Sequence, residues 1–315
     1  MTTTKEKRPE GKKMEHVGAR REKTENTTGK NTTGKTAVIT GATSGIGLAA
    51  LKELAGLGFR VIGVGRAAKR CAEAEASIRS EMPGARVDYL VADLSSQRQV
   101  RDLAAAISRL LETENGGCLD LLVNNAGTVS SWYVTTEDGY EMQFAVNHLA
   151  PFLLTRELLP LLNKAGFARV ITTSSGSHYN TRMNWRDVMY RRGYNCLLAY
   201  KQSKLANVLF TSEFNRRQGP GSRIRAYAVD PGLVNTGIGE KGTNGFVCWF
   251  WRIRRQRGVA PEIAARTIIH LATTPGLEDP EAVYWKDCRP KRPSGYSQRE
   301  DAGRRLWELS ERLTS

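Results

Sequence analysis

Three glycines, Gly41, Gly45 and Gly47, stand between a short apolar run, Thr36–Thr40, and a segment with helical spacing, residues 48–57. A strand that turns into a helix presents unpaired N–H groups and positive potential at the helix N-terminus, which suits a phosphate group. Glycine permits the tight turn and a close approach of the backbone to a ligand. The pattern predicts an α/β fold with a phosphate-binding turn after its first strand.

Strand-like and helix-like segments alternate after this turn. We expect further buried strands at residues 60–64, 87–91, 119–123, 168–172 and 225–229, with helices at 67–81, 97–112, 139–163 and 199–217. Strands separated by ~10–20-residue helical segments indicate right-handed βαβ units and a parallel sheet covered on both faces. The sequence therefore predicts a single doubly wound Rossmann domain over residues 34–315, with a mostly parallel sheet of about seven strands.

Composition fits a folded protein in a reducing compartment. The 315 residues are 40% hydrophobic and 25% charged, as in an ordinary core-forming chain. The five cysteines are scattered and never form a CxxC pair, so we expect neither disulfides nor a bound metal. No stretch approaches the ~20 apolar residues of a membrane-spanning helix, and no apolar signal segment opens the chain. We expect a cytoplasmic protein.

The chain is strongly basic, with a formal net charge of +15 at pH 7. Residues 1–33 contain nine Lys or Arg, five Glu and almost no apolar side chains, so we expect a disordered basic tail that cannot offset its ordering entropy. A basic surface can attract nucleic acid, an anionic membrane or a phosphorylated cofactor. Because no helix-turn-helix, zinc-finger or base-stacking pattern accompanies the charge, we expect no nucleic-acid partner.

A tyrosine and a lysine, Tyr200 and Lys204, stand four residues apart in a helical pattern. Residues at i and i+4 lie on one helix face, so the phenol and the ammonium can point into one cleft. A nearby cation favours the phenolate, which brings a phenol of ordinary pKa about 10 toward acid–base work near neutrality. Alone, such a pair is usually amphipathic surface. With the glycine turn, it predicts an enzyme that binds a dinucleotide and moves a proton and a hydride.

The end of the second expected strand bears on the choice of dinucleotide. In such folds an acidic side chain there binds the ribose 2′-hydroxyl and repels a 2′-phosphate. Here the strand ends at Arg66, with Lys69 and Arg70 behind it and no acid nearby. Because arginine can bind a phosphate through two parallel hydrogen bonds, we expect NADP (NADPH) rather than NAD. The alternative is that Arg66 only adds to a basic surface.

Six motifs follow one another along the chain: the glycine turn 40–47, Asn124-Asn-Ala-Gly127, Asn147, Ser174-Ser175, Tyr200-x-x-x-Lys204 and Pro231-Gly232. In this order they resemble the short-chain dehydrogenase/reductase family, over about residues 35–309. Residues 136–155, 203–211, 285–288 and 306–310 are similar to its retinol dehydrogenase branch. That resemblance implies a Rossmann fold, a nicotinamide cofactor and a lipophilic alcohol or carbonyl substrate.

By this resemblance, four residues are catalytic. Tyr200 would be the general acid in carbonyl reduction and the base in alcohol oxidation. Lys204 would lower the pKa of Tyr200 and hold the nicotinamide ribose. Ser175 would donate a hydrogen bond to the substrate oxygen, and Asn147 would bind a water that links Lys204 to solvent. A serine after a strand can instead be a cap or turn residue, and an asparagine can simply bend its helix.

The resemblance also implies a set of cofactor-binding residues. Asp93 would meet the adenine, although it can also merely cap the following helix. Asn124 and Gly127 would line the adenosine, and Thr236 would meet the nicotinamide carboxamide. The whole set is Gly41, Ser44, Gly45, Ile46, Gly47, Arg66, Asp93, Leu94, Asn124, Ala126, Gly127, Tyr200, Lys204, Pro231, Gly232, Val234 and Thr236.

An aromatic and basic stretch runs from Phe246 to Arg257. In a helix, Phe246, Trp249, Phe250 and Ile253 would share one face. In the family this region is a lid over the substrate, and an aromatic lid suits an apolar carbonyl compound. The same face can instead form a contact between subunits of a homo-oligomer or rest on an anionic intracellular membrane. Both alternatives stay open.

The sequence thus predicts an NADP-dependent short-chain alcohol dehydrogenase or carbonyl reductase that interconverts a lipophilic alcohol, retinol-like at first guess, and its aldehyde or ketone. Two other classes stay open. One is a catalytically idle NADP(H)-binding sensor or scaffold, which would bind NADPH without turnover. The other is a basic protein that reuses the fold to bind nucleic acid or membranes, with steeply salt-dependent association.

Overall fold

The computed structural model describes residues 1–2, 34–112, 115–234, 258–277, 279 and 282–315. They contain an eight-stranded sheet in the order β3-β2-β1-β4-β5-β6-β7-β8. The strands are β1 (Thr36–Thr40), β2 (Arg60–Gly65), β3 (Val87–Val91), β4 (Leu121–Asn124), β5 (Ala168–Thr173), β6 (Ile224–Asp230), β7 (Tyr284–Lys286) and β8 (Arg289–Pro290). Every pairing through β7 is parallel, and the short β8 is antiparallel. The predicted doubly wound α/β fold is confirmed.

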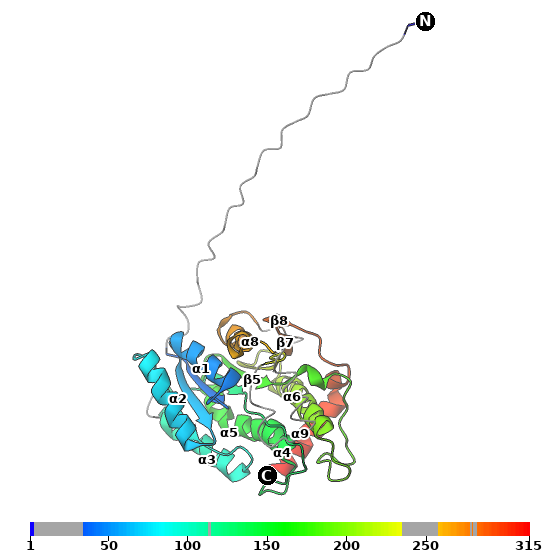
Figure 1. Cartoon of the computed structure of the whole chain (residues 1–315), viewed down its shortest axis with the longest axis horizontal. Coiled ribbons are helices and arrows are strands. Elements are labelled where there is room, and N and C mark those ends of the chain that lie inside the picture. Colours follow the sequence, from blue (N-terminus) through cyan, green and yellow to red (C-terminus); the bar gives the residue numbers. More distant parts are fainter. Residues whose placement is uncertain (3–33, 113–114, 235–257, 278, 280–281) are drawn as a thin grey trace.

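Helices cover both faces of the sheet (Figure 1). The apolar residues of one face pack with α1 (Gly45–Gly56), α2 (Ala68–Glu81) and α8 (Pro261–Thr273). Those of the other face pack with α3 (Gln97–Glu112), α5 (Ala150–Lys164) and α6 (Cys196–Gln218). Strand β1 contributes to both cores, because Ala37 and Ile39 pack in the core under α1, α2 and α8, and Val38 packs in the core under α3, α5 and α6. Side chains alternate between the two faces along a strand, and a strand buried on both faces is apolar throughout.

Short helical turns connect the main elements. They are η2 (Asn115–Gly117), α4 (Met142–Phe144), η3 (Ala145–Leu149), η4 (Gly176–His178) and η6 (Tyr296–Gln298). None of the helices in the described ranges has the length and apolar character needed to cross a membrane. The predicted tail, residues 1–33, lies outside the described residues except for Met1 and Thr2, and the predicted lid, residues 246–257, lies outside them entirely.

Side-chain caps set two helix starts that differ from the sequence prediction. The helix expected at 139–163 begins at Met142, because the Glu141 carboxylate accepts hydrogen bonds from Gln143 N (3.0 Å) and Phe144 N (2.7 Å). Helix α6 begins at Cys196 rather than at residue 199, because Asn195 accepts from the N–H groups of Leu197 and Leu198. Such caps satisfy N–H groups that have no partner within the helix.

The last helix, α9 (Glu300–Leu313), lies beside α6 on the outside of the second layer (Figure 1). Its Trp307 ring stands 5.0 Å from the ring centroid of Phe152 on α5, and 6.0 Å from that of Phe210 on α6. Six of the about seven expected strands can be placed from the sequence, and neither a strand nor a helix is predicted within residues 258–315, so the structure adds α8, β7, β8 and α9. This aromatic cluster packs α9 against α5 and α6.

The aromatic cluster gives a stability test. Phe210 is buried and contacts the rings of Phe152, Phe214 and Trp307. We expect Phe210→Ala to lower the free energy of unfolding by about 3 kcal/mol, because it removes buried apolar surface and leaves a cavity. Leu198→Ala on the same helix is the control, since Leu198 is 45% exposed, and it should cost about 0.5 kcal/mol or less. Urea denaturation of both variants measures the difference, and equal losses would contradict the packing role.

Candidate active site

The sheet reverses its order of winding between β1 and β4, which lie side by side. In open α/β sheets, ligands bind outside the carboxyl ends of the strands at such a switch point. The predicted site residues gather at this edge. Following each strand in turn, they are the glycine turn after β1, Arg66 after β2, Asp93 and Leu94 after β3, Asn124, Ala126 and Gly127 at and after β4, Ser175 after β5, and Pro231, Gly232 and Val234 after β6.

The glycine turn is held tightly against the segment after β4. Gly41 has a φ of +68°, and a Cβ there would stand 2.9 Å from the Ala126 Cα. A Cβ on Gly47 would meet the Gly41 carbonyl oxygen and stand 2.6 Å from the Asn125 side-chain nitrogen. Asn125 itself donates to the Thr40 carbonyl oxygen at 3.0 Å. Asn125 therefore fixes the turn, although it is not among the site residues predicted from the sequence.

The N-terminus of α1 fits the phosphates of a dinucleotide. Ser44 is its extended N-cap residue and makes no side-chain cap hydrogen bond, and the first turn of α1 holds no acidic residue. The first N–H groups of the helix, from Gly45 to Gly47, therefore favour an anion. Arg66 is exposed at the neighbouring strand end. Gly41 and Gly47 are packed too closely for either position to carry a side chain beside this N-terminus.

Two predicted adenosine contacts have other partners in the structure. The Asp93 carboxylate accepts hydrogen bonds from Ser95 N (2.9 Å) and Ser95 Oγ (2.8 Å) and so closes a local turn. Helix α3 begins at Gln97, whose N–H donates to Asp138, so the expected alternative of a helix cap at Asp93 is not what the structure shows. Asn124 is buried, and its side-chain nitrogen donates to Thr155 Oγ1 on α5 at 3.0 Å. Only the main chain of Asn124 thus lies at the strand end, because its side chain points into the helix layer.

Tyr200 and Lys204 meet in the first turns of α6, as their spacing predicts. The Lys204 ammonium stands 5.7 Å from the centroid of the Tyr200 ring. Lys204 is 2% exposed, and its Nζ donates to the Thr173 carbonyl oxygen at 3.0 Å, at the end of β5. Burial lowers the pKa of Lys204 to about 8, since a low-dielectric environment disfavours the charged form.

The two neighbouring serines have different partners. Ser174 is buried, and its hydroxyl donates to the Lys204 carbonyl oxygen at 2.8 Å, so it holds α6 to the end of β5. Ser175 is half-buried and is the N-cap residue of η4, where its Oγ accepts from Ser177 N at 3.2 Å. A hydroxyl that accepts a hydrogen bond still has its own hydrogen to donate. Ser175 is thus both a turn residue and the available donor of the pair.

Asn147 lies in the π turn η3 and is fully buried. Its Oδ1 accepts from Thr128 N at 2.7 Å, while its Nδ2 donates to the Thr128 carbonyl oxygen and to Ser203 Oγ, both at 3.0 Å. The Asn147 side chain therefore ties the segment after β4 to α6. A π turn widens the helical backbone and is frequent at functional sites.

After β6, the main chain turns at Pro231-Gly232, where Gly232 has a φ of +74°. The buried Asp230 carboxylate accepts from Gly232 N at 3.0 Å and so stabilises this turn. Val234 pairs with Val259 in an isolated parallel bridge. Thr236 lies outside the described residues. Within the described ranges, no cluster of three or more His, Cys, Asp or Glu side chains is arranged to hold a metal ion.

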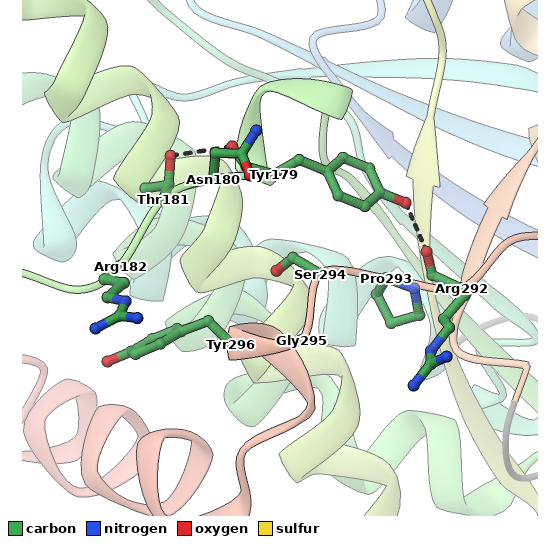
Figure 2. Close-up of a pocket in the computed structure, with 9 residues that line it drawn as sticks. All are labelled: Tyr179, Asn180, Thr181, Arg182, Arg292, Pro293, Ser294, Gly295 and Tyr296. Carbon is green, nitrogen blue, oxygen red and sulfur yellow. Dashed lines mark hydrogen bonds between the residues drawn. The ribbon is translucent and has the colours of Figure 1, made fainter.

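A pocket of about 540 Å³ lies along the segment that follows Ser175 (Figure 2). Its walls are residues 179–182 and 292–296. The Tyr179 hydroxyl crosses from one wall to the other and donates to the Arg292 carbonyl oxygen at 2.6 Å. No predicted site residue lines this pocket, so it is separate from the edge where Tyr200 and Lys204 lie.

Comparison with known proteins agrees with this geometry. A family model for short chain dehydrogenases matches residues 35–244. Human retinol dehydrogenase 13 is 37% identical over 289 residues, which cover 89% of this chain and 84% of that protein. The chain belongs to the short-chain dehydrogenase family. Within it, the chain belongs to the retinol dehydrogenase-like branch, which also includes human retinol dehydrogenase 14, 37% identical over 88% of this chain and 85% of its own length.

Solved structures show the same fold. A protein from Mycobacterium Paratuberculosis superposes with a TM-score of 0.70 and is 33% identical, covering 90% of this chain and 94% of its own. A metagenomic short-chain oxidoreductase solved in complex with NADP gives a TM-score of 0.58 at 25% identity, over 83% of this chain and 98% of its own. Family membership makes this short-chain dehydrogenase an oxidoreductase and supports a nicotinamide cofactor.

The buried Lys204 gives a pH-dependent prediction. Its pKa falls from 10.5 to about 8 on folding. Between these values the unfolded chain keeps a proton that the folded chain has released, so stability rises with pH across this window. We expect the free energy of unfolding, relative to that of Lys204→Met, to rise by about 2 kcal/mol from pH 7 to pH 10. Urea denaturation of both cofactor-free proteins at each pH measures this, and a flat difference would contradict the lowered pKa.

Proposed function

We propose that the chain is an NADP-dependent oxidoreductase that interconverts a lipophilic alcohol and its aldehyde or ketone, with Tyr200 as the general acid and base. The observation that carries the proposal is the buried Lys204 ammonium, which stands 5.7 Å from the centroid of the Tyr200 ring and is bonded to the carboxyl end of β5. A cation fixed beside a phenol stabilises its phenolate, the form that accepts a proton.

Cofactor binding is assigned to the strand ends. The glycine turn and the N-terminus of α1 would hold the pyrophosphate, and Arg66 would bind the 2′-phosphate of NADP through its guanidinium group. The exposed Arg66 at the end of β2, with no acidic residue beside it, supports NADP. When bound, the nicotinamide supplies or accepts the hydride.

The protein's own contribution is to position the substrate oxygen and to move its proton. In reduction, Tyr200 Oη would give a proton to the substrate oxygen, and in oxidation it would take one. Ser175 Oγ would donate a hydrogen bond to the same oxygen and stabilise the charge that develops there. Its geometry supports this role, because Oγ is oriented by Ser177 N and the neighbouring Ser174 is already engaged with α6.

Proton exchange with solvent is assigned to Lys204 and the π turn. Both the oxygen and the nitrogen of the Asn147 amide are hydrogen-bonded to protein groups. A relaying water would therefore be held by main-chain groups of η3 rather than by this amide. A lysine with a pKa of about 8 exchanges protons readily near neutral pH. Lys204 can therefore return the proton of Tyr200 through such a water after each turnover.

The substrate class is inferred from relatives and from the surface around the site. The named relatives are dehydrogenases of retinol and of polyprenol, the latter from mouse, 35% identical over 89% of this chain and 84% of its own length. Large apolar side chains are exposed on segments that border the site, namely Trp132 at 55%, Leu198 at 45% and Leu233 at 39%. Exposed apolar side chains on these segments suit a long apolar alcohol.

Loss of the Tyr200 hydroxyl tests the mechanism. We expect Tyr200→Phe to abolish NADPH oxidation at 340 nm with retinal and with medium-chain aldehydes, because the phenylalanine ring has no proton to give. NADPH binding, followed by calorimetry, should stay within about threefold of wild type, since the binding residues are intact. Retained turnover would remove Tyr200 from the acid role. Tight NADPH binding by the wild type without turnover would favour the sensor or scaffold alternative.

Charge removal at the end of β2 tests the choice of cofactor. We expect Arg66→Ala to weaken NADPH binding about 10- to 100-fold and NADH binding far less, because only NADPH offers a phosphate to the guanidinium group. The control is Arg304→Ala, which removes an equal charge from the exposed face of α9. Dissociation constants from fluorescence titration measure both. Equal weakening of NADPH and NADH by Arg66→Ala would contradict the phosphate contact.

A further inference from the structure

A buried histidine, His178, connects the candidate catalytic serine to a segment more than a hundred residues away. Its ring Nδ1 lies 2.8 Å from the Ser175 carbonyl oxygen. Its Nε2 lies 3.1 Å from the main-chain nitrogen of Ser294, which follows β8. His178 is fully buried. Neither His178 nor Ser294 belongs to the residues predicted from the sequence.

These partners fix the protonation state of the ring. A main-chain N–H can only donate, so Nε2 of His178 accepts from Ser294. A carbonyl oxygen can only accept, so Nδ1 carries the proton and donates to Ser175. A neutral imidazole holds one donor and one acceptor, which is what the two partners require. Burial lowers the pKa of His178, which agrees with a neutral ring.

The surroundings of the ring hold it in place. The rings of Tyr179 and Tyr284 pack on it, with centroids 4.2 Å and 4.7 Å away. Two nearby charged groups act oppositely on the pKa of His178, which the Asp230 carboxylate raises and the Lys291 ammonium lowers. The ring is therefore confined by aromatic contacts, and its two hydrogen bonds set its orientation.

The turn that carries Ser175 depends on this ring. The Ser175 carbonyl oxygen accepts from His178 Nδ1 and also from His178 N at 3.1 Å, which closes the turn η4. The Ser175 hydroxyl accepts from Ser177 N within the same turn. Movement of the Ser175 main chain would therefore move its hydroxyl, and a displacement of about 1 Å at a reacting centre can cost about 100-fold in rate.

We propose that His178, as the neutral Nδ1–H tautomer, is a positioning residue that orients the Ser175 hydroxyl through the hydrogen bond from Nδ1–H to the Ser175 carbonyl oxygen, while Ser294 N fixes the tautomer by donating to Nε2. The proposal rests on the proposed function, in which Ser175 donates to the substrate oxygen. Ser294 lies in the wall of the pocket opposite Tyr179 (Figure 2) and is itself held by Ser297 Oγ at 3.0 Å. The link thus runs from the C-terminal segment to the catalytic edge.

Two substitutions separate the two hydrogen bonds of the ring. An asparagine amide can take the place of Nδ1, so His178→Asn keeps a donor for Ser175 and loses the acceptor for Ser294. A glutamine reaches the place of Nε2, so His178→Gln keeps the acceptor for Ser294 and loses the donor for Ser175. We expect His178→Gln to lower kcat about 10- to 100-fold and His178→Asn to stay within about fivefold of wild type.

The Michaelis constant for NADPH should stay the same in both variants, since the phosphate-binding turn is untouched. His270→Asn on α8 is the control for the substitution itself, because His270 contacts Thr274 and not the catalytic turn. A purely structural role would rank the variants by their thermal midpoints instead. Equal loss of kcat in His178→Asn and His178→Gln, or a ranking that follows the midpoints, would overturn the proposal.

The Ser175→Ala background tests whether the effect passes through the serine. If it does, His178→Gln should lower kcat less than about twofold further there, because coupled residues are not additive. A full additional loss would overturn the proposal. Nitrogen chemical shifts of His178 in the wild-type protein give a readout independent of turnover. A proton on Nε2 would overturn the link, whereas wild-type protein without any turnover but with the proton on Nδ1 would overturn only the proposed function.

Discussion

The buried ammonium of Lys204 is the interaction on which the site depends. A charge removed from water is costly unless it is paired or hydrogen-bonded, and here it is bonded to the Thr173 carbonyl oxygen at the end of β5. The same carbonyl oxygen also accepts from Asn207, one turn further along α6. These two bonds fix the rotation of α6 about its axis and its position along that axis relative to the end of β5. Tyr200 lies four residues before Lys204, so its position follows.

Three further links hold the catalytic edge together. Ser174 bonds the main chain of Lys204, Asn147 joins the segment after β4 to Ser203, and His178 joins the turn of Ser175 to Ser294. Each link connects elements that are distant in the chain. A hydroxyl, an amide and an imidazole thus serve to place Tyr200 and Ser175, and a preorganised site of this kind needs little rearrangement during reaction.

The C-terminal segment supports this edge from outside. Trp307 on α9 packs between the rings of α5 and α6, and the Trp185 indole donates to Tyr296 Oη at 2.9 Å. The stretch between Ser175 and α6 is thereby packed against residues 294–307. In the proposed function, variation in this stretch would reshape the surroundings of the substrate without disturbing the strand ends proposed to hold the cofactor.

Local pattern was enough to predict the main fold and the residues of the site edge. Buried strands alternating with helices indicate a parallel sheet, and its strand ends must gather the glycine turn, Arg66, Ser175 and Pro231 on one side. The i, i+4 spacing likewise predicts that Tyr200 and Lys204 meet. Periodicity over ten to twenty residues is a local property, and for that reason the sequence by itself determined these features.

Only the tertiary structure decided which side chains at this edge form hydrogen bonds within the protein. Asn124 donates a hydrogen bond to Thr155 on α5, and Asp93 accepts one from Ser95 within its own turn. The Asn147 amide is hydrogen-bonded to Thr128 and Ser203. The three-residue strand β7 and the contacts of α9 were likewise not predicted from the sequence. Partners such as His178 and Ser294 lie 116 positions apart, and no local spacing specifies a hydrogen bond that depends on how distant layers pack.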